Sequence, residues 1–338
     1  MENLKLLLKM CEINSVSGKE DALVEFLKEK LKDFADEIKI TNLKSVVAKI
    51  KNKKTNSSAL KIALEAHIDS VGLVVEEITK EGFLKIADFK NIDPKALISK
   101  EVVVCGKKEF LGFVFSPTTN KEKIDTNNIF VNVNLTKEQA EKNIKKGDSI
   151  VFKFNPAFLK NNKISVRFLD NKASVAAIFL VLEKLKKTNF NNELSIIFSS
   201  LEETNQKGAK TAAYLNKPDI LISVDVSFAK TLNTPKQNEL AKLGEGPLIG
   251  ISPGLNKKFS NKLIEIAKEK KIPHQLEIMP GLTGTNADEL LSVKDGILTC
   301  LCSIPIKNMH TPVEIVDLKD IENTAELIYS FIVSVKGD

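Results

Sequence analysis

The sequence predicts an α/β fold, a mostly parallel sheet flanked by helices, with an inserted small β-barrel-like domain. In residues 1–70 and 162–338, strand-like and helix-like segments alternate, which is typical of a parallel sheet covered by helices on both faces. In residues 71–161, short strand-like runs follow one another with a single helix-like segment among them. A chain of 338 residues is long enough for two domains. We predict a discontinuous main domain of residues 1–70 and 162–338 and an inserted domain of residues 71–161.

The first part of the main domain is predicted to contain one helix and two strands. Ser17 and Glu20 have the spacing of a capping box, and apolar residues from Leu23 to Leu31 recur at helical spacing. The apolar runs 45–50 and 60–66 have the composition of neighbouring buried strands.

The inserted segment is predicted to mediate contacts between subunits. Its strands carry many apolar residues, so an isolated module of this size would expose apolar patches and strand edges. A neighbouring subunit is the simplest cover, which gives residues 71–161 an oligomerisation role. The predicted strands are 71–75, 102–105, 110–115 and 149–152, and the predicted helix is 137–146.

The second part of the main domain returns to regular alternation. Its apolar runs and helical periodicities follow one another closely, as in successive strand–helix units of a parallel sheet. The predicted helices are 172–187, 207–215, 257–270 and 318–333, and the predicted strands are 194–200, 220–224 and 297–304.

Composition and charge exclude several classes of protein. The net charge is +6, but the lysines are spread along the chain without a dense basic block, so nucleic acid binding is not indicated. No run approaches the ~20 apolar residues that a membrane helix needs. The four cysteines lack a secretory context, and the N-terminus does not resemble a signal peptide. We therefore expect a cytoplasmic protein that does not bind membranes.

Two histidines and several acids fall where predicted strands end. His67 and Asp69 close one strand, and alternation along the strand would point both side chains to the same side. Asp69 could then orient a metal-bound His67 through its second ring nitrogen. A hydrogen-bonded histidine at a polar strand end is the structural alternative for this pair.

The remaining candidates also have structural alternatives when each is taken alone. Asp170 precedes an apolar helix and could be its N-cap. The adjacent Glu202 and Glu203 could belong to a solvated loop, although both would repel each other if buried without a cation. Asp225 and His310 follow apolar strands, where ligands collect in open α/β sheets.

Taken together, these residues predict a centre for two divalent metal ions. Strand ends at the same edge of a sheet converge in space, and histidine nitrogens and carboxylate oxygens are the ligands of catalytic zinc and related metals. A carboxylate can bridge two ions, and metal pairs about 3.5–4 Å apart are used for peptide hydrolysis. Five such ligands are too many for one four-coordinate catalytic ion with an open position.

The ordered motifs AHID, LDNK, LEET, SVDV and NMHTP resemble those of the tetrahedral-particle aminopeptidases, dinuclear metallopeptidases that include glutamyl and deblocking aminopeptidases. SVSGKE, QKGAKTAA, LGEGPLI and GTNAD extend the resemblance over nearly the whole chain. The chain departs from the usual pattern at Ser70, Asn286 and Lys307, where the family commonly has two acids and an arginine, which bears on substrate preference.

The resemblance implies a role for each candidate. Asp170 would bridge two ions, zinc or cobalt, and Glu202 would be the general base, with Asp69 beside the site as a second catalytic residue. The resemblance also implies peptide substrates and a dodecameric homo-oligomer. The implied metal ligands are His67 and Asp225 at one ion, Glu203 and His310 at the other, and Asp170 at both.

The sequence therefore predicts an aminopeptidase that removes N-terminal residues by metal-activated water. One alternative is a metal-dependent amidohydrolase or deacylase on the same scaffold, and another is a non-catalytic assembly or binding protein of the same fold. Some relatives are labelled endoglucanases, but the absence of tryptophan and an aromatic content of 6% argue against a carbohydrate cleft. His274, Cys300 and Cys302 are not expected to be ligands.

Overall fold

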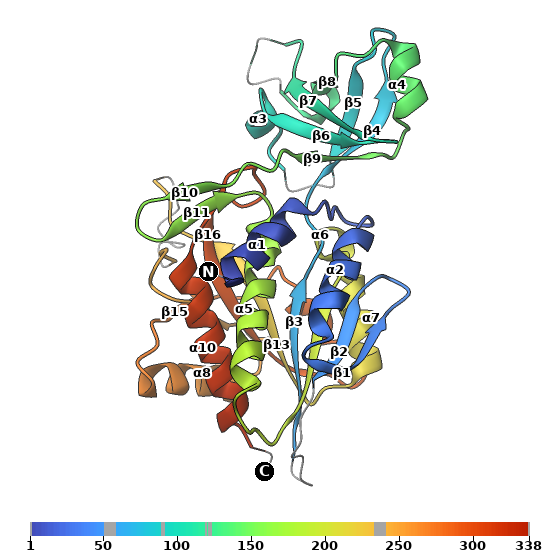
Figure 1. Ribbon diagram of the computed structural model, residues 1–338. Helices are drawn as coiled ribbons and strands as arrows, with labels where there is room; N and C mark the ends of the chain where they lie inside the picture. The colour runs from blue at the N-terminus through green and yellow to red at the C-terminus, as the bar shows by residue number, and fades with distance from the viewer. Residues whose placement is uncertain are drawn as a thin grey trace.

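A computed structural model describes residues 2–50, 59–88, 92–118, 120, 124–232 and 241–336. It consists of a large α/β body and a separate small barrel that stands on one end of this body (Figure 1). Among the described residues, none of the helices has both the length and the apolar composition needed to cross a lipid bilayer.

The large body is built on an 11-stranded mixed sheet. Four central strands, in the order β12-β3-β13-β16, run parallel to one another, and antiparallel strands extend the sheet on both sides. The continuous apolar sequence of the central strands explains their position, because parallel strands are buried on both faces. The main strand path is β1 (Ala35–Ile40), β2 (Val46–Ile50), β12 (Glu193–Ser199), β3 (Lys61–His67), β13 (Ile220–Phe228), β16 (Leu298–Lys307), β17 (Glu314–Asp317), β11 (Lys163–Val166) and β10 (Ala157–Leu159), with β14 (Leu248–Ile251) and β15 (Gln275–Ile278) off this path.

Helices cover both faces of this sheet (Figure 1). Alternate residues of β3 show the two cores, because Ile62 and Leu64 pack with the helices of one face and Ala63 with those of the other. Almost all of α5 is buried between the sheet and its neighbours α1 and α10. The α/β fold predicted from the sequence is thus confirmed. The helices of this body are α1 (Glu2–Glu12), α2 (Asp21–Leu31), α5 (Leu169–Leu185), α6 (Glu202–Asn205), α7 (Lys207–Asn216), α8 (Lys257–Glu269), α9 (Ala287–Leu290) and α10 (Leu318–Ser334).

The inserted segment forms a closed six-stranded antiparallel barrel, as the sequence predicted. It has an apolar core of its own, which includes Leu73, Val104 and Val131. The first and last strands pair with each other, with Leu73 opposite Ile150, so the chain enters and leaves the barrel at neighbouring points. The order around the barrel is β4 (Leu73–Ile78), β5 (Leu84–Asp88), β8 (Phe130–Asn132), β7 (Glu109–Phe115), β6 (Glu101–Cys105) and β9 (Ser149–Phe152), and the short helices α3 (Pro94–Leu97), η2 (Thr126–Asn128) and α4 (Lys137–Asn143) lie in its loops.

The capping box expected at Ser17 and Glu20 is wrong. Glu20 is the residue before α2 and makes no side-chain cap hydrogen bond. The Ser17 hydroxyl instead donates to Asp69 at 2.5 Å. Because α2 begins only at Asp21, Ser17 lies too far before the helix to cap it, and its hydroxyl instead binds the carboxylate that follows β3.

Candidate metal centre

The parallel strands bring the predicted candidates to one edge of the sheet. Ser199 at the end of β12 lies opposite His67 at the end of β3, and the helix α6 with Glu202 and Glu203 begins directly after β12. Asp225 lies near the end of β13, beside β3. Because parallel strands end on the same side, side chains from distant parts of the chain meet there.

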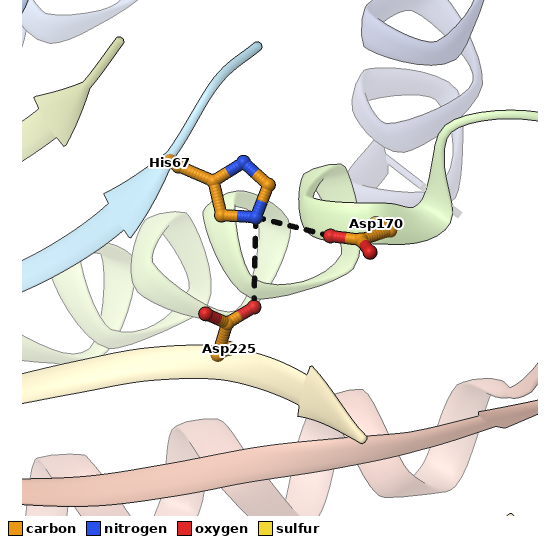
Figure 2. Close-up of side chains that lie close together, drawn as sticks. All are labelled: His67, Asp170 and Asp225. Atoms are coloured by element: carbon orange, nitrogen blue, oxygen red, sulfur yellow. Dashed lines mark ion pairs between the residues drawn. The ribbon is translucent and has the colours of Figure 1, made fainter. Parts of the chain in front are cut away.

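One group of potential ligands consists of His67, Asp170 and Asp225, all buried. The Nε2 atom of His67 lies 3.0 Å from Asp170 Oδ1 and 3.6 Å from Asp225 Oδ1. Figure 2 shows both carboxylates pointing toward this single nitrogen from different elements, α5 and β13. The three ligand atoms lie within 4.8 Å of one another, a separation that a metal ion can bridge.

A second group shares Asp170 with the first and adds Glu203 and His310. The Nε2 atom of His310 lies 3.1 Å from Asp170 Oδ2 and 3.5 Å from Glu203 Oε2. The two oxygens of Asp170 therefore face different histidines, Oδ1 toward His67 and Oδ2 toward His310. This is the arrangement of a carboxylate between two ions.

The electrostatics of the cluster fit bound cations. Burial, together with the charge of Asp170, raises the pKa of Glu203 well above its usual value, and burial likewise raises the pKa of Asp225. Burial alone would also raise the pKa of Asp170, but hydrogen bonds from His310 and His67 hold it below its ordinary value. Glu203 Oε1 is buried and has no hydrogen-bond partner among the described residues. Divalent ions would satisfy these carboxylates, so the donor set fits a metal pair.

Asp69 connects the two halves of the cluster. Its Oδ1 accepts a hydrogen bond from the backbone nitrogen of Glu202 at 3.0 Å, and its Oδ2 accepts one from that of Glu203 at 3.1 Å. His67 Nδ1 lies 3.3 Å from the Asp69 carbonyl oxygen and 3.6 Å from Oδ1. Asp69 thus holds the start of α6 and the ring of His67 in one position.

Glu314, which was not a candidate from the sequence, supports the other half. Its two oxygens accept from the backbone nitrogens of His310 at 2.8 Å and Asp170 at 3.1 Å. Burial, with the charge of Asp170, raises the pKa of this carboxyl to about 8. The available signal was an acid placed at the start of a strand whose next residues are apolar.

Glu65 is a second supporting acid that the sequence reasoning missed. It lies inside β3 and accepts hydrogen bonds from Asn286 at 2.7 Å, Ser199 at 2.5 Å and Ser223 at 2.8 Å. These contacts join three parallel strands and the loop that carries Asn286. An acid within a continuous apolar strand was the signal for this role.

The cluster opens into a cavity of about 740 Å³. Glu202 lines it, and burial raises the pKa of this carboxyl to about 8. Glu202 Oε1 also accepts from Gln206 Nε2 at 3.1 Å. Three residues were not expected to be ligands, and the structure places them outside the cluster. Nδ1 of His274 lies 3.0 Å from the carbonyl oxygen of Ile272, and Cys300 and Cys302 are buried in the hydrophobic core.

Residues 45–327 match the model of the M42 glutamyl aminopeptidase family. The chain belongs to this family. It is 30% identical to the lysyl aminopeptidase of Pyrococcus furiosus, over 99% of this chain and 98% of the relative. Among solved structures, it resembles the aminopeptidase APDkam598 of the archaeon Desulfurococcus kamchatkensis, with 30% identity, coverage of 99% and 96%, and a TM-score of 0.93.

A dodecameric relative, described as PhTET1-12s, is 25% identical, with coverage of 98% and 99% and a TM-score of 0.84. The similarity extends over the barrel as well as the large body, because nearly the full length of both chains is covered. As an M42 family member, this chain is a metallo-aminopeptidase-type peptidase.

Proposed function

We propose that this protein is a di-metal aminopeptidase that removes N-terminal residues from peptides. The observation that carries the proposal is the position of Asp170 between two histidine-containing ligand groups. We propose His67 and Asp225 as ligands of one ion, Glu203 and His310 as ligands of the other, and zinc or cobalt as the ions. When bound, such ions lower the pKa of water and polarise the peptide carbonyl.

Glu202 is the proposed general base. Its carboxylate lines the cavity beside the ligand groups and is one residue away from the ligand Glu203. It would accept a proton from the attacking water and deliver it to the leaving amine. Asp69 would position Glu202 by accepting a hydrogen bond from its backbone nitrogen. It would also fix the orientation of the His67 ring.

We also propose that the protein works as a homo-dodecamer in the cytoplasm. Support for the assembly comes from the barrel, which matches that of a dodecameric relative across nearly the full chain. Support for the compartment comes from the cysteines, since all four are free thiols.

The proposal is tested by hydrolysis of aminoacyl p-nitroanilides after metal removal and after reloading with zinc or cobalt. We expect turnover only in the loaded protein and only with a free α-amine. Faster hydrolysis of N-acylated amino acids would identify an amidohydrolase instead. If the loaded protein binds two metal ions but hydrolyses neither class of substrate, it is a non-catalytic member of the fold.

A further inference from the structure

Glu277 is an acid in the cavity that belongs to neither group of potential ligands and takes no part in the proposed proton transfer. It lies on β15 and lines the same cavity as the metal cluster. Its Oε1 accepts a hydrogen bond from the hydroxyl of Ser227 at 2.5 Å. This contact holds the carboxylate against β13, two residues beyond the proposed ligand Asp225.

No cation compensates Glu277 among the described residues. None of the side chains that line the cavity is a lysine or arginine, and Glu277 forms no ion pair in the part of the chain that the structure describes. Burial raises the pKa of Glu277, and the charge of Asp225 raises it further, while the hydroxyls of Ser227 and Ser303 lower it. Beyond the ions proposed at the ligand groups, a cationic group brought by a ligand would stabilise such a carboxylate.

Ser303 is a second hydroxyl beside Glu277. Its side chain lines the same cavity from β16 and is only 1% exposed. Its hydroxyl oxygen is buried and makes no hydrogen bond of standard geometry among the described residues, but it lies near enough to Glu277 to lower the pKa of that carboxyl. Because a hydroxyl can donate to one group and accept from another, this oxygen could also accept from a polar group that enters the cavity.

The spacing along β13 fits one amino-acid side chain. Asp225 and Ser227 project from the same face of the strand, and two residues of strand span roughly 6.6 Å. A lysine side chain extends roughly 6 Å from its Cα to its ammonium nitrogen. A residue whose α-amine lies at the metal cluster would therefore place an ammonium near Glu277, with its carbon stem along the wall formed in part by Met309.

We propose that Glu277 is the specificity-determining residue of the cavity and selects peptides whose N-terminal residue has a cationic side chain, lysine or arginine. The Ser303 hydroxyl would accept a second hydrogen bond from that cation. This inference rests on the proposed aminopeptidase function and adds to it the class of side chain that is removed.

The test compares lysyl with norleucyl p-nitroanilide, because these two side chains share a stem and differ at its end. We expect the metal-loaded wild type to have a kcat/KM at least about tenfold higher for the lysyl substrate, the range of one hydrogen bond to a charged group. Glu277→Gln should lower kcat/KM for the lysyl substrate much more than for the norleucyl substrate, and so remove most of this preference. Glu277→Lys should reject the lysyl substrate. Glu265→Gln, which neutralises an acid on the exposed face of α8, is the matched control and should behave like the wild type.

Two outcomes would overturn the inference while leaving the proposed function intact. One is a wild type that prefers norleucyl or glutamyl substrates. The other is a Glu277→Gln variant in which kcat/KM falls equally for all substrates. That result would mean that Glu277 binds the α-amine of the substrate rather than its side chain. If no anilide is hydrolysed, calorimetry measures the binding of free lysine and norleucine to the metal-loaded protein. Tighter binding of lysine that is lost in Glu277→Gln supports the inference, and equal binding rejects it.

Discussion

The neighbouring acids Glu202 and Glu203 have different surroundings although they are adjacent in the sequence. Glu203 is buried, with Oε2 at 3.5 Å from His310 Nε2, whereas Glu202 is partly exposed to the cavity and bonds to Gln206. One α-helical step separates their side chains by about 100°. The local turn of α6 therefore directs Glu203 toward His310 and Glu202 toward Gln206 and the cavity.

This difference predicts distinct effects of two equivalent substitutions. Glu202→Gln should bind two metal ions per chain and lose about 10²- to 10⁴-fold in kcat, because an amide cannot accept the proton of water. Glu203→Gln should instead weaken the binding of one ion. Metal content after gel filtration, measured beside kcat, checks both expectations. The reverse pattern in the two variants would exchange the roles assigned to the pair.

Asp69 is expected to act through its neighbours rather than on substrate. Asp69→Asn replaces one of two carboxylate oxygens that accept from Glu202 and Glu203 with an NH₂ group, which cannot accept. We expect a loss of about 10- to 100-fold in metal affinity or kcat, as is usual for groups that orient ligands. Metal titration and steady-state kinetics measure it. Asp36→Asn, on the exposed side of β1, is the control and should change neither value.

The potential metal ligands could be predicted from the sequence, but the acids that hold them in place through hydrogen bonds could not. His67, Asp225 and His310 could be singled out because each follows an apolar strand. Glu65 and Glu314 act through hydrogen bonds to residues more than a hundred positions away, such as Ser199 and Asp170. Those partners are defined only by the fold, and no local pattern specifies them.

At the scale of elements, one buried arginine holds the junction between the barrel and the large body. Arg167 is the single arginine of the sequence and follows β11 directly. Its guanidinium donates to the carbonyl oxygens of Cys11, Glu12 and Phe152 and to the side chain of Asn14. The partners belong to the end of α1, the loop after it, and the last barrel strand, so the planar fork joins three segments.

Replacing Arg167 should weaken this junction. Arg167→Met leaves several buried acceptors without a donor, and we expect the free energy of unfolding to fall by about 2 to 4 kcal/mol. Arg167→Lys offers a single ammonium in place of the fork and should lose a smaller part of that amount. Urea unfolding of the metal-free protein measures the change. Stability equal to the wild type in Arg167→Met would show that the junction does not depend on these bonds.

The elements that sequence reasoning found and missed differ in length and polarity. The central strands β3, β12 and β13 were predicted because a continuous apolar run records burial on both faces. The four-residue strands β14, β15 and β17 were missed because glycine or polar residues limit each to one or two consecutive apolar residues, whereas the equally short β9 was predicted from its run Ile150–Phe152. Glu277 lies on β15, so this part of the cavity wall could not be predicted from the sequence.

At the scale of the whole molecule, the barrel presents apolar side chains outward. Leu111 and Phe113 alternate with inward-facing residues on β7 and are 47% and 49% exposed. These two side chains are not members of the apolar core of the barrel. If the barrel mediates the proposed assembly, these two neighbouring apolar side chains are the surface that another copy of the chain would cover.

The last prediction follows from this surface. The double variant Leu111→Lys/Phe113→Lys should yield a particle of lower mass than the wild type, because two buried charges at a subunit contact cost more than the contact gains. Light scattering measures the particle mass, and metal content should stay at the wild-type level since the barrel holds none of the proposed ligands. The double variant Tyr214→Lys/Leu215→Lys on α7, where the two side chains are 57% and 51% exposed, introduces the same charge on the large body and is the control. A double variant with unchanged mass, or a control that dissociates equally, would remove the barrel from its proposed role in assembly.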